Sequence, residues 1–315
     1  MDNSAVCTKA LILAAGYGTR LKPLTDTLPK ALVPLVGKPL LQHNIARLLQ
    51  AGVGAIGINT HHHADLIKQF ATGHHECMLH ISHEPAILGS AGGIGGFRDF
   101  LNNEEFFVVC NADSVSDITC DRYLQDFLHN APLVMMVLTD NPGTNNVCIN
   151  SSLEVVDLRD SLRPQKVAAR LTYTGIAYMS RTFLEMIPPG GSELVPMLLK
   201  LIAEKPGCIR AAIARDAAWS DIGTHASYLQ AHREILLQRR PLIPEPYMPE
   251  GALYIGENTY VGENCVFEGF VSIGSNCSIG PGSGLHDCIV WDDTALPDAS
   301  RICRTICGPG FTINV

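Results

Sequence analysis

The sequence lacks any apolar run close to the ~20 residues that a membrane-spanning helix needs. Basic residues are in the minority, with 23 Lys and Arg against 31 Asp and Glu, which gives a formal net charge of −8. This balance argues against general nucleic-acid binding, although a local basic pocket for a small anion remains compatible with it. The apolar stretch near the N-terminus has no basic leader and no cleavage site, so we expect a first core strand rather than a signal peptide.

Cysteine pairs with metal-ligand spacing are also missing. The eleven cysteines are scattered along the chain, and none forms a CxxC pair. The sequence therefore disfavours both a zinc site and a disulfide framework. We expect buried, reduced thiols in a cytoplasmic protein.

Up to about residue 238, strand-like apolar runs alternate with helix-like segments. The run KALILAAG ends in glycine and is typical of a strand buried on both faces. Further strands are expected at 55–59, 106–113 and 133–139, and helices at 41–49, 64–71 and 120–130. This alternation predicts an α/β fold with an open, mostly parallel Rossmann-like sheet, whose ligands bind outside the carboxyl ends of the strands.

A proline-dense stretch follows this region. Pro241, Pro244, Pro246 and Pro249 lie close together, and prolines at this density stop helices and favour an extended linker. We therefore predict a first domain over 1–238, a linker over 239–250 and a second domain over 251–315.

Beyond the linker, apolar residues repeat every six positions. The series is Ile255, Val261, Phe267, Ile273, Ile279 and Leu285, and after one dropped residue it resumes at Val290, Leu296 and Ile302. Asn258, Asn264 and Asn276 stand three residues after an apolar position, where a left-handed backbone is tolerated. Hexapeptide repeats predict a short left-handed parallel β-helix of about three coils. The alternative is a loop-rich antiparallel module.

The stretch LAAGYGTRLKPLTDTLPKALVP directly follows the first expected strand. A strand that runs into a glycine-rich turn presents backbone N–H groups to an anion. Gly16 and Gly18 would allow close approach, while Arg20 and Lys30 would supply positive charge. The stretch matches neither the dinucleotide fingerprint nor the Walker pattern. On these residues alone, a plain strand–turn–helix junction stays open.

In combination, the motifs resemble the signature of the sugar-1-phosphate nucleotidylyltransferases. The opening match comprises Gly16, Gly18, Thr19, Arg20, Pro23, Leu24, Thr25, Pro29 and Lys30. The resemblance continues through 84–94, 110–114, 171–179 and 219–224. The branch that looks most similar includes N-acetylmuramate-1-phosphate uridylyltransferase and the mannose- and heptose-phosphate guanylyltransferases. The hexapeptide tail is similar to that of several members of the wider family.

The resemblance implies that a sugar 1-phosphate oxygen attacks the α-phosphorus of a nucleoside triphosphate in line, and pyrophosphate leaves. Because the nucleophile is already ionised, no protein base is needed, and catalysis depends on positioning and charge neutralisation. The resemblance assigns Arg20 and Lys30 to the leaving group, and Asp113 and Asp221 to Mg²⁺. Each aspartate could instead cap a following helix.

The resemblance also implies two sets of binding residues. The nucleotide set comprises Leu13, Ala14, Ala15, Gly16, Gly18, Thr19, Glu84, Gly92 and Gly93. The sugar-phosphate set comprises Asn141, Arg159 and Gly175. Alternatively, Glu84 is a surface carboxylate, Asn141 a turn residue and Gly175 a strand bulge.

One part of the family pattern is missing. Many members carry a lysine in a Glu-x-Lys-Pro segment that binds the sugar phosphate, but this chain reads LEVVDLRDSLRPQK there. Arg159 is the nearest cationic substitute, followed by Arg163 and Lys166. The three adjacent histidines at 61–63 cannot all face one metal ion in regular structure, so we expect a loop at the rim of the sugar pocket instead.

Two other functions remain open. A hexapeptide acyltransferase, alone or as a second activity, would draw on His225, His232 or His286. A non-catalytic relative that senses a sugar nucleotide would be expected to lose the charged residues that are all present here.

The sequence leaves the nucleobase and the sugar open. It favours GTP or UTP, with mannose, heptose, glucose or N-acetylmuramic acid 1-phosphate. The open ends and flat apolar faces of a short β-helix predict a homo-oligomer.

Overall fold

The computed structural model describes residues 7–74 and 76–315. The first six residues of the stretch that we compared with a signal peptide lie outside the described residues. The chain divides into two compact units, each assembled from separated segments. Unit 1 comprises 1–17, 44–112 and 118–217, and unit 2 comprises 18–43, 113–117 and 218–315. The domain boundaries at 238 and 250 stay a prediction.

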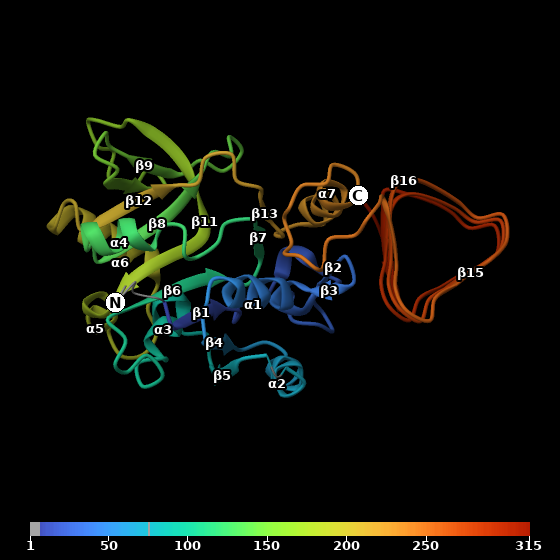
Figure 1. Cartoon of the computed structure of the whole chain (residues 1–315), viewed down its shortest axis with the longest axis horizontal. Coiled ribbons are helices and arrows are strands. Elements are labelled where there is room, and N and C mark those ends of the chain that lie inside the picture. The colour runs from blue at the N-terminus through green and yellow to red at the C-terminus, as the bar shows by residue number, and fades with distance from the viewer. Residues whose placement is uncertain (1–6, 75) are drawn as a thin grey trace, which may run out of the picture. The chain divides into compact units, whose positions relative to one another are not determined.

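Unit 1 is built on a nine-stranded sheet (Figure 1). Its parallel part has the order β6–β1–β4–β5. These strands are β6 (Phe106–Asn111), β1 (Lys9–Leu13), β4 (Ala55–Thr60) and β5 (Met78–His83). The strands expected near 9–16, 55–59 and 106–113 are therefore confirmed.

The rest of the sheet is organised by one long strand, β11 (Ala169–Ser180), which runs antiparallel to its partners. The partners are β6, β8 (Val134–Thr139) and β9 (Val147–Ile149). Two further strands complete the sheet: β12 (Ile209–Ile213) parallel to β8, and β10 (Val155–Leu158) antiparallel to β9. The predicted α/β fold with a mostly parallel central sheet is confirmed, and β11 adds antiparallel pairs that we did not predict.

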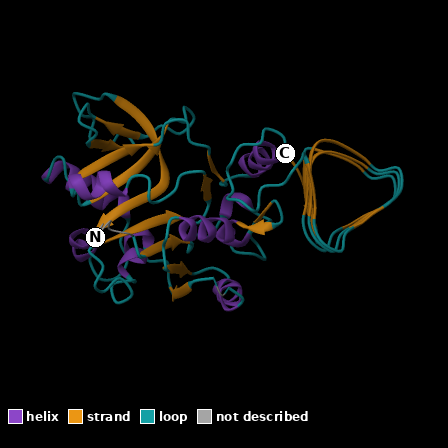
Figure 2. Ribbon diagram, in the orientation of Figure 1, coloured by secondary structure: helices purple, strands orange, loops and turns teal. Residues whose placement is uncertain are grey.

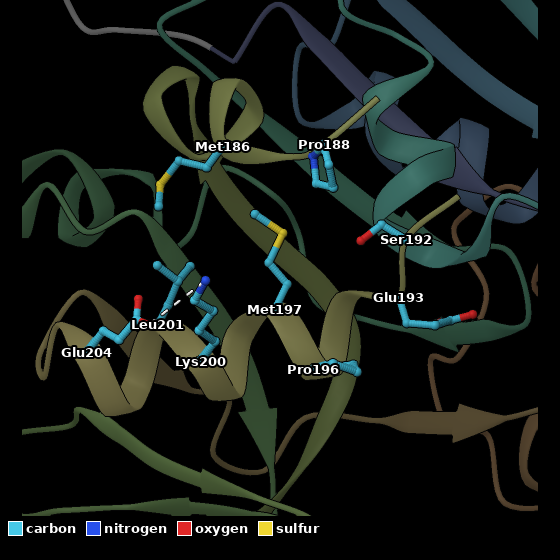
Figure 3. A pocket seen from close by; sticks show the side chains of 9 residues that line it. All are labelled: Met186, Pro188, Ser192, Glu193, Pro196, Met197, Lys200, Leu201 and Glu204. Atoms are coloured by element: carbon cyan, nitrogen blue, oxygen red, sulfur yellow. Dashed lines mark ion pairs between the residues drawn. The ribbon is translucent and has the colours of Figure 1, made fainter. Parts of the chain in front are cut away.

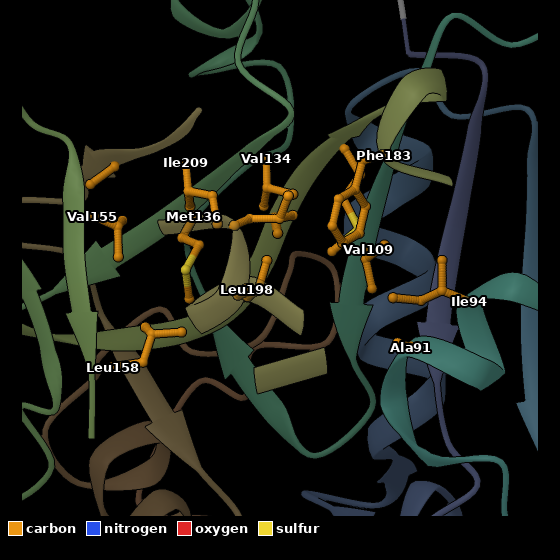
Figure 4. Packing of buried hydrophobic residues seen from close by; sticks show 14 of the residues in the cluster. Ala91, Ile94, Val109, Val134, Met136, Val155, Leu158, Phe183, Leu198 and Ile209 are labelled. Atoms are coloured by element: carbon orange, nitrogen blue, oxygen red, sulfur yellow. The ribbon is translucent and has the colours of Figure 1, made fainter. Parts of the chain in front are cut away.

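Helices cover the sheet of unit 1. They are α2 (Ala64–Thr72), α3 (Gly89–Gly95), α4 (Leu124–Asn130), α5 (Arg181–Met186), α6 (Leu194–Glu204) and the larger part of α1 (Leu40–Gln50). Figure 4 shows apolar side chains between sheet and helices, among them Ile94 of α3, Val109 of β6, Phe183 of α5 and Leu198 of α6. Each such buried side chain stabilises the fold by about 1.5–3 kcal/mol.

Unit 2 contains short elements from all three of its segments. They are the 3₁₀ helices η1 (Thr19–Leu21) and η2 (Lys30–Leu32), the pair β2 (Pro34–Leu35) and β3 (Lys38–Pro39), the pair β7 (Ser114–Ser116) and β13 (Trp219–Asp221), and the helix α7 (His225–Leu236). Both strand pairs are antiparallel.

The C-terminal part of unit 2 is a parallel β-helix. One hydrogen-bonded sheet consists of β14 (Leu253–Ile255), β16 (Val266–Ile273), β18 (Gly284–Val290), β20 (Arg301–Cys303) and β21 (Thr305–Gly308), and another of β15 (Tyr260–Val261), β17 (Ser278–Ile279) and β19 (Ala295–Leu296). Figure 2 shows the coils as a triangle with strands on its sides and loops at its corners. The last strand, β22 (Phe311–Asn314), folds back antiparallel onto β21.

The strand register agrees with the hexapeptide repeat. Phe267 pairs with Leu285, 18 residues further on, whereas Leu285 pairs with Ile302, 17 residues further on. The shorter step is the dropped residue seen in the sequence. Asn258 and Asn276 both have a φ of 55°, as their predicted left-handed positions require. The alternative of an antiparallel module is wrong.

The glycine after an apolar repeat position is needed because the next coil approaches closely. A Cβ atom at Gly280 would lie 2.5 Å from the carbonyl carbon of Pro297. We expect Gly280→Ala to lower the free energy of unfolding by about 2 kcal/mol, because backbone atoms must shift. Gly251→Ala is the control, since no atom lies within 4 Å of its Cβ position. Urea unfolding followed by tryptophan fluorescence would show this, and equal midpoints for both variants would contradict it.

The buried position of His232 in α7 predicts that the folded protein loses stability in acid. Its ring is buried, Nε2 accepts a hydrogen bond from the Val36 N–H at 3.1 Å, and Nδ1 lies 3.1 Å from the Tyr228 carbonyl oxygen. Burial, with a smaller contribution from His43, lowers the His232 pKa to about 4.

The unfolded histidine therefore binds more protons than the folded one between about pH 6.5 and 4. We expect the free energy of unfolding to fall over this window by about 3 kcal/mol and to be unaffected by His232 above it. Urea titrations at pH 7 and 5 of the parent and of His232→Leu would test this. An equally steep pH dependence in His232→Leu would contradict it.

The expectations drawn from missing features can also be compared with the structure. No helix among the described residues is long and apolar enough to cross a membrane. All eleven cysteines are free, and most are buried. The prediction of buried, unpaired thiols is therefore confirmed for seven of them, whereas Cys77, Cys208 and Cys265 are half-buried and Cys303 is exposed.

Candidate active site

Four predicted site residues lie together in unit 2. Lys30 Nζ is 2.5 Å from Asp113 Oδ2. The pKa of Asp221 is raised, mainly by burial and then by the negative charge of Asp113, while Lys30 and Arg20 act in the opposite direction. A Cβ atom on Gly223 would lie 2.7 Å from Asp221 Oδ2 and 3.1 Å from Arg20 Nη2. The structure thus gathers two cations and two carboxylates from three distant parts of the chain.

Short backbone elements hold the two aspartates. Asp221 ends β13 and pairs in register with Ser114 of β7, directly after Asp113. The Ile222 N–H donates to the Asp113 carbonyl oxygen at 2.8 Å. Neither aspartate caps a helix, because Asp113 is followed by a strand and the cap of α7 is Thr224. The capping alternatives are therefore wrong.

This pair of carboxylates suits a divalent cation. Aspartate oxygens are the hard ligands that Mg²⁺ prefers, and a site with few protein ligands is typical where substrate phosphates supply the others. The pKa of Asp221 is raised mainly by burial and then by the charge of Asp113, and a bound cation would favour the ionised form of both carboxylates. The donor set fits the predicted metal, although its identity stays a prediction.

Another group of possible ligands lies elsewhere in unit 1. Cys148, Asp157 and Asp160 have ligand atoms within 4.8 Å of one another. However, Asp157 already accepts hydrogen bonds from the N–H groups of the following loop, and Asp160 pairs with Arg170 at 2.5 Å. This group is better explained as the support of the loop after β10.

The predicted phosphate loop requires a glycine at one position. Gly18 has a φ of 65°, and a Cβ atom there would lie 2.9 Å from Thr25 Cγ2 and 3.1 Å from Lys30 Cβ. Thr25 Oγ1 also donates to the Gly18 carbonyl oxygen at 3.0 Å. Thr19 begins η1 directly after it. By contrast, no atom lies within 4 Å of the Cβ position of Gly16, so packing does not require glycine there.

In unit 1, the predicted nucleotide residues after β1 are held by a buried polar chain. The Ala14 N–H donates to Asn59 Oδ1 at 2.7 Å, and Asn59 Nδ2 donates to Glu84 Oε1 at 2.7 Å. The other oxygen of Glu84 accepts the Leu88 N–H at 2.9 Å. Glu84 is only 2% exposed, so the alternative of a surface carboxylate is wrong. The sequence analysis missed Asn59, although a polar residue at the carboxyl end of a buried strand could have indicated it.

The other residues predicted to bind the nucleotide pack against the hydrogen-bonded chain of Glu84, Asn59 and Ala14, or against residues next to it. A Cβ atom at Gly93 would lie 2.5 Å from Asn59 Nδ2 and 2.9 Å from Glu84 Oε1. One at Gly92 would lie 2.7 Å from the Gly190 carbonyl oxygen. The Leu13 carbonyl oxygen accepts a hydrogen bond from the Ala112 N–H at 3.1 Å, and Ala14 and Ala15 are buried. Their contacts with a nucleotide stay a prediction.

The sugar-phosphate residues occupy irregular backbone. Asn141 begins a turn, since its carbonyl oxygen accepts the Thr144 N–H at 2.9 Å. Gly175 has a φ of 88° and lies where the register of β11 against β8 shifts, so the predicted bulge is confirmed. Arg159 has a φ of 57° in the loop that follows β10. The sugar-phosphate roles of all three stay predictions.

The three adjacent histidines do not gather around one point. Both ring nitrogens of His61 have partners, with Nδ1 2.7 Å from the Glu84 carbonyl oxygen and Nε2 3.3 Å from the Tyr17 hydroxyl. The rings of His62 and His63 lie against each other with centroids 3.9 Å apart. The contacts of His61 are those of a loop residue rather than of a zinc ligand.

Unit 1 also has a pocket of about 520 Å³ beside α6 (Figure 3). Met186, Met197 and Leu201 supply apolar lining, while Lys200 and Glu204 lie together at one end. None of the predicted site residues is among the lining residues. One of them, Gly92, nevertheless contacts a lining residue, because its N–H donates to the Ser192 carbonyl oxygen at 2.9 Å.

Two family models match the chain. The nucleotidyl transferase model matches residues 9–146, and the model for bacterial transferase hexapeptide (six repeats) matches residues 253–287. The first match contains Arg20, Lys30 and Asp113, and the second lies within the β-helix.

Several known proteins are similar to most of this chain. The catalytic subunit beta of mannose-1-phosphate guanylyltransferase from Xenopus tropicalis is 28% identical over 277 residues, covering 86% of this chain and 74% of that protein. The UTP–glucose-1-phosphate uridylyltransferase of Synechocystis is 23% identical over 337 residues, covering 93% and 85%. Among solved structures, HddC from Yersinia pseudotuberculosis complexed with GMP-PN shares the fold, with a TM-score of 0.60 and 22% identity over 71% of this chain and 97% of that one.

Proposed function

Because the chain belongs to the sugar-1-phosphate nucleotidylyltransferase family, we propose that it transfers GMP from GTP to mannose 1-phosphate with Mg²⁺ and releases pyrophosphate. The observation that carries this proposal is the cluster of Arg20, Lys30, Asp113 and Asp221. The guanylyltransferases among the relatives support the choice of base and sugar.

In this proposal, the charged cluster acts on the triphosphate. Arg20 and Lys30 neutralise the negative charge that develops on the leaving pyrophosphate, because a planar fork and a mobile ammonium both suit phosphate oxygens. When GTP enters, Lys30 exchanges its bond with Asp113 for bonds to phosphate oxygens. Asp113 and Asp221 would hold Mg²⁺, which supplies positive charge at the α-phosphate during in-line attack.

In unit 1, the buried chain from Glu84 to Ala14 orients the backbone that would face the nucleoside. The carboxylate fixes Asn59, and Asn59 fixes the Ala14 N–H. A backbone held in this way loses little further entropy when a ligand binds. The sugar 1-phosphate would bind to Asn141, Arg159 and Gly175.

One panel of assays tests the proposal. Pyrophosphate release is measured with GTP, UTP, ATP and dTTP, each combined with the 1-phosphates of mannose, glucose, heptose and N-acetylmuramic acid, with and without Mg²⁺. The proposal expects the highest kcat/KM for GTP with mannose 1-phosphate. A preference for UTP with glucose 1-phosphate would instead favour the activity named for the Synechocystis relative. No release with any pair would overturn the proposal.

The alternatives receive less support. His232 is buried, and both of its ring nitrogens have partners, so it is poorly suited to acyl transfer. A sensing role would not need the four charged residues to stay together. The homo-oligomer stays a prediction, which light scattering at micromolar concentration would test.

A further inference from the structure

Helix α7 lies between the predicted metal site and the β-helix within unit 2. Its N-terminus follows the Asp221 loop directly, and Thr224 and Ser227 form a capping box there. Ser227 Oγ also accepts the Gly223 N–H at 3.0 Å. The backbone that carries Asp221 is thereby fixed to the first turn of the helix.

The middle of α7 holds the segment that follows Lys30. The Tyr228 hydroxyl donates to the carbonyl oxygen of Pro34, and His232 Nε2 accepts the Val36 N–H at 3.1 Å. Between Lys30 and Pro34 the chain has little freedom, since the Val33 N–H donates to the Lys30 carbonyl oxygen at 3.1 Å and Val33 is fully buried. A displacement of Pro34 would therefore move Lys30.

The β-helix supports α7 on its other side. Trp291 Nε1–H donates to the Tyr228 hydroxyl oxygen at 3.0 Å, and Arg233 Nη1 pairs with Asp287 Oδ2 at 3.0 Å. Asp287 is itself buried and accepts the Phe270 N–H at 3.2 Å. The Tyr228 hydroxyl thus donates a hydrogen bond to the Pro34 carbonyl oxygen and accepts one from the Trp291 indole N–H.

The junction leaves little space beside these bonds. A small gap lined by Pro34, Tyr228, Trp291 and their neighbours measures about 10 Å³, close to what one water molecule needs. Gly37 is also closely packed, since a Cβ atom there would lie 2.6 Å from Tyr254 Cε1 of the first coil. Removing the Tyr228 hydroxyl would therefore take away the partner of both the Trp291 indole N–H and the Pro34 carbonyl oxygen.

We infer that Tyr228 and Trp291 are positioning residues, through which the β-helix holds Lys30 in place to bind the leaving pyrophosphate. The inference rests on the proposed function, because it assigns the β-helix a task in the same phosphate site. Neither residue needs to touch the substrate. The chain of contacts runs from Trp291 to Tyr228, to Pro34 and so to Lys30.

The test compares Tyr228→Phe and Trp291→Phe with Tyr260→Phe, a control at an exposed position of the β-helix. We expect hydrogen–deuterium exchange of the backbone amides in 30–37 to be about five- to tenfold faster in the first two variants only, as expected for one lost hydrogen bond. Trp291→Phe keeps the bond between Tyr228 and Pro34, so it serves as the test if Tyr228→Phe does not fold. Unchanged exchange in Trp291→Phe would overturn the inference.

Steady-state kinetics separates positioning from mere stability. We expect KM for the nucleoside triphosphate to rise about five- to tenfold, with KM for the sugar 1-phosphate unchanged. In a Lys30→Met background, Tyr228→Phe should cause no further rise, because both changes act on one group. A fall in kcat alone, matched by a loss of folded protein, would contradict the inference. If the parent releases no pyrophosphate while exchange still responds, the proposed function fails and the support of the Lys30 segment stands.

Discussion

Replacing Asp113 and Asp221 together with asparagine is expected to lower the rate of pyrophosphate release by at least about 1000-fold. Asparagine keeps the shape of each side chain but removes both negative charges, so the divalent cation would lose its protein ligands. The backbone bond between Ile222 and Asp113 does not involve either side chain and should survive. The measurement is pyrophosphate release at saturating Mg²⁺, and activity that survives the double substitution would exclude these aspartates as metal ligands.

The same site predicts a gain of stability when one charge is removed. The Asp221 pKa is raised in the folded protein, so the folded state binds more protons than the unfolded state between the two pKa values. Stability therefore falls as pH rises from the ordinary aspartate pKa through the raised one, and the ionised carboxylate destabilises the metal-free protein at pH 7. Asp221→Asn should then unfold at an equal or higher urea concentration than the parent.

Asp99→Asn, at an exposed position of unit 1, is the matched control and should leave the midpoint unchanged. Addition of Mg²⁺ should stabilise the parent more than Asp221→Asn, because a ligand that binds only the folded state shifts the unfolding equilibrium. A clear loss of stability in Asp221→Asn at pH 7 without metal would contradict the destabilising effect assigned to the ionised Asp221 carboxylate. An Asp221→Asn variant that is stable but inactive would show that this carboxylate is required for activity and not for folding.

The resemblance to the family motifs predicted the charged cluster, because Arg20, Lys30, Asp113 and Asp221 match the site residues of that family. Lys30 and Asp113 are 83 positions apart, and their direct ion pair was not predicted. The repeat of the β-helix was equally readable, since each coil imposes the same spacing on its apolar residues. Periodicity is a local signal, and the prediction of the β-helix depends on it.

Other features depend on partners that no local pattern reveals. The antiparallel direction of β11 is set by the strands beside it, and buried strands of either direction show the same apolar run. The contact of Trp291 with Tyr228 joins segments 63 positions apart. Glu84 belongs to the same class, because one carboxylate in a loop gives no sign that two buried donors surround it.

Glu84 accordingly predicts a large effect on both stability and nucleotide binding. Its two oxygens accept the Asn59 amide and the Leu88 N–H in a buried setting. In Glu84→Gln, one of these donors would face the new NH₂ group, and loss of a charge-assisted hydrogen bond costs about 2 kcal/mol. In Glu84→Leu, both donors lose their acceptor and the cost should approach about 4 kcal/mol.

The functional effect of these variants follows from Asn59. If Asn59 moves, the Ala14 N–H loses the acceptor that holds it at 2.7 Å. We therefore expect Glu84→Gln to raise KM for the nucleoside triphosphate about tenfold, the equivalent of about 1.4 kcal/mol, while KM for the sugar 1-phosphate stays constant. Glu204→Gln, an exposed change on α6, is the control for stability and kinetics. Because a general loss of folded protein lowers the rate without changing either KM, equal KM values in Glu84→Gln and the parent would restrict Glu84 to a structural role.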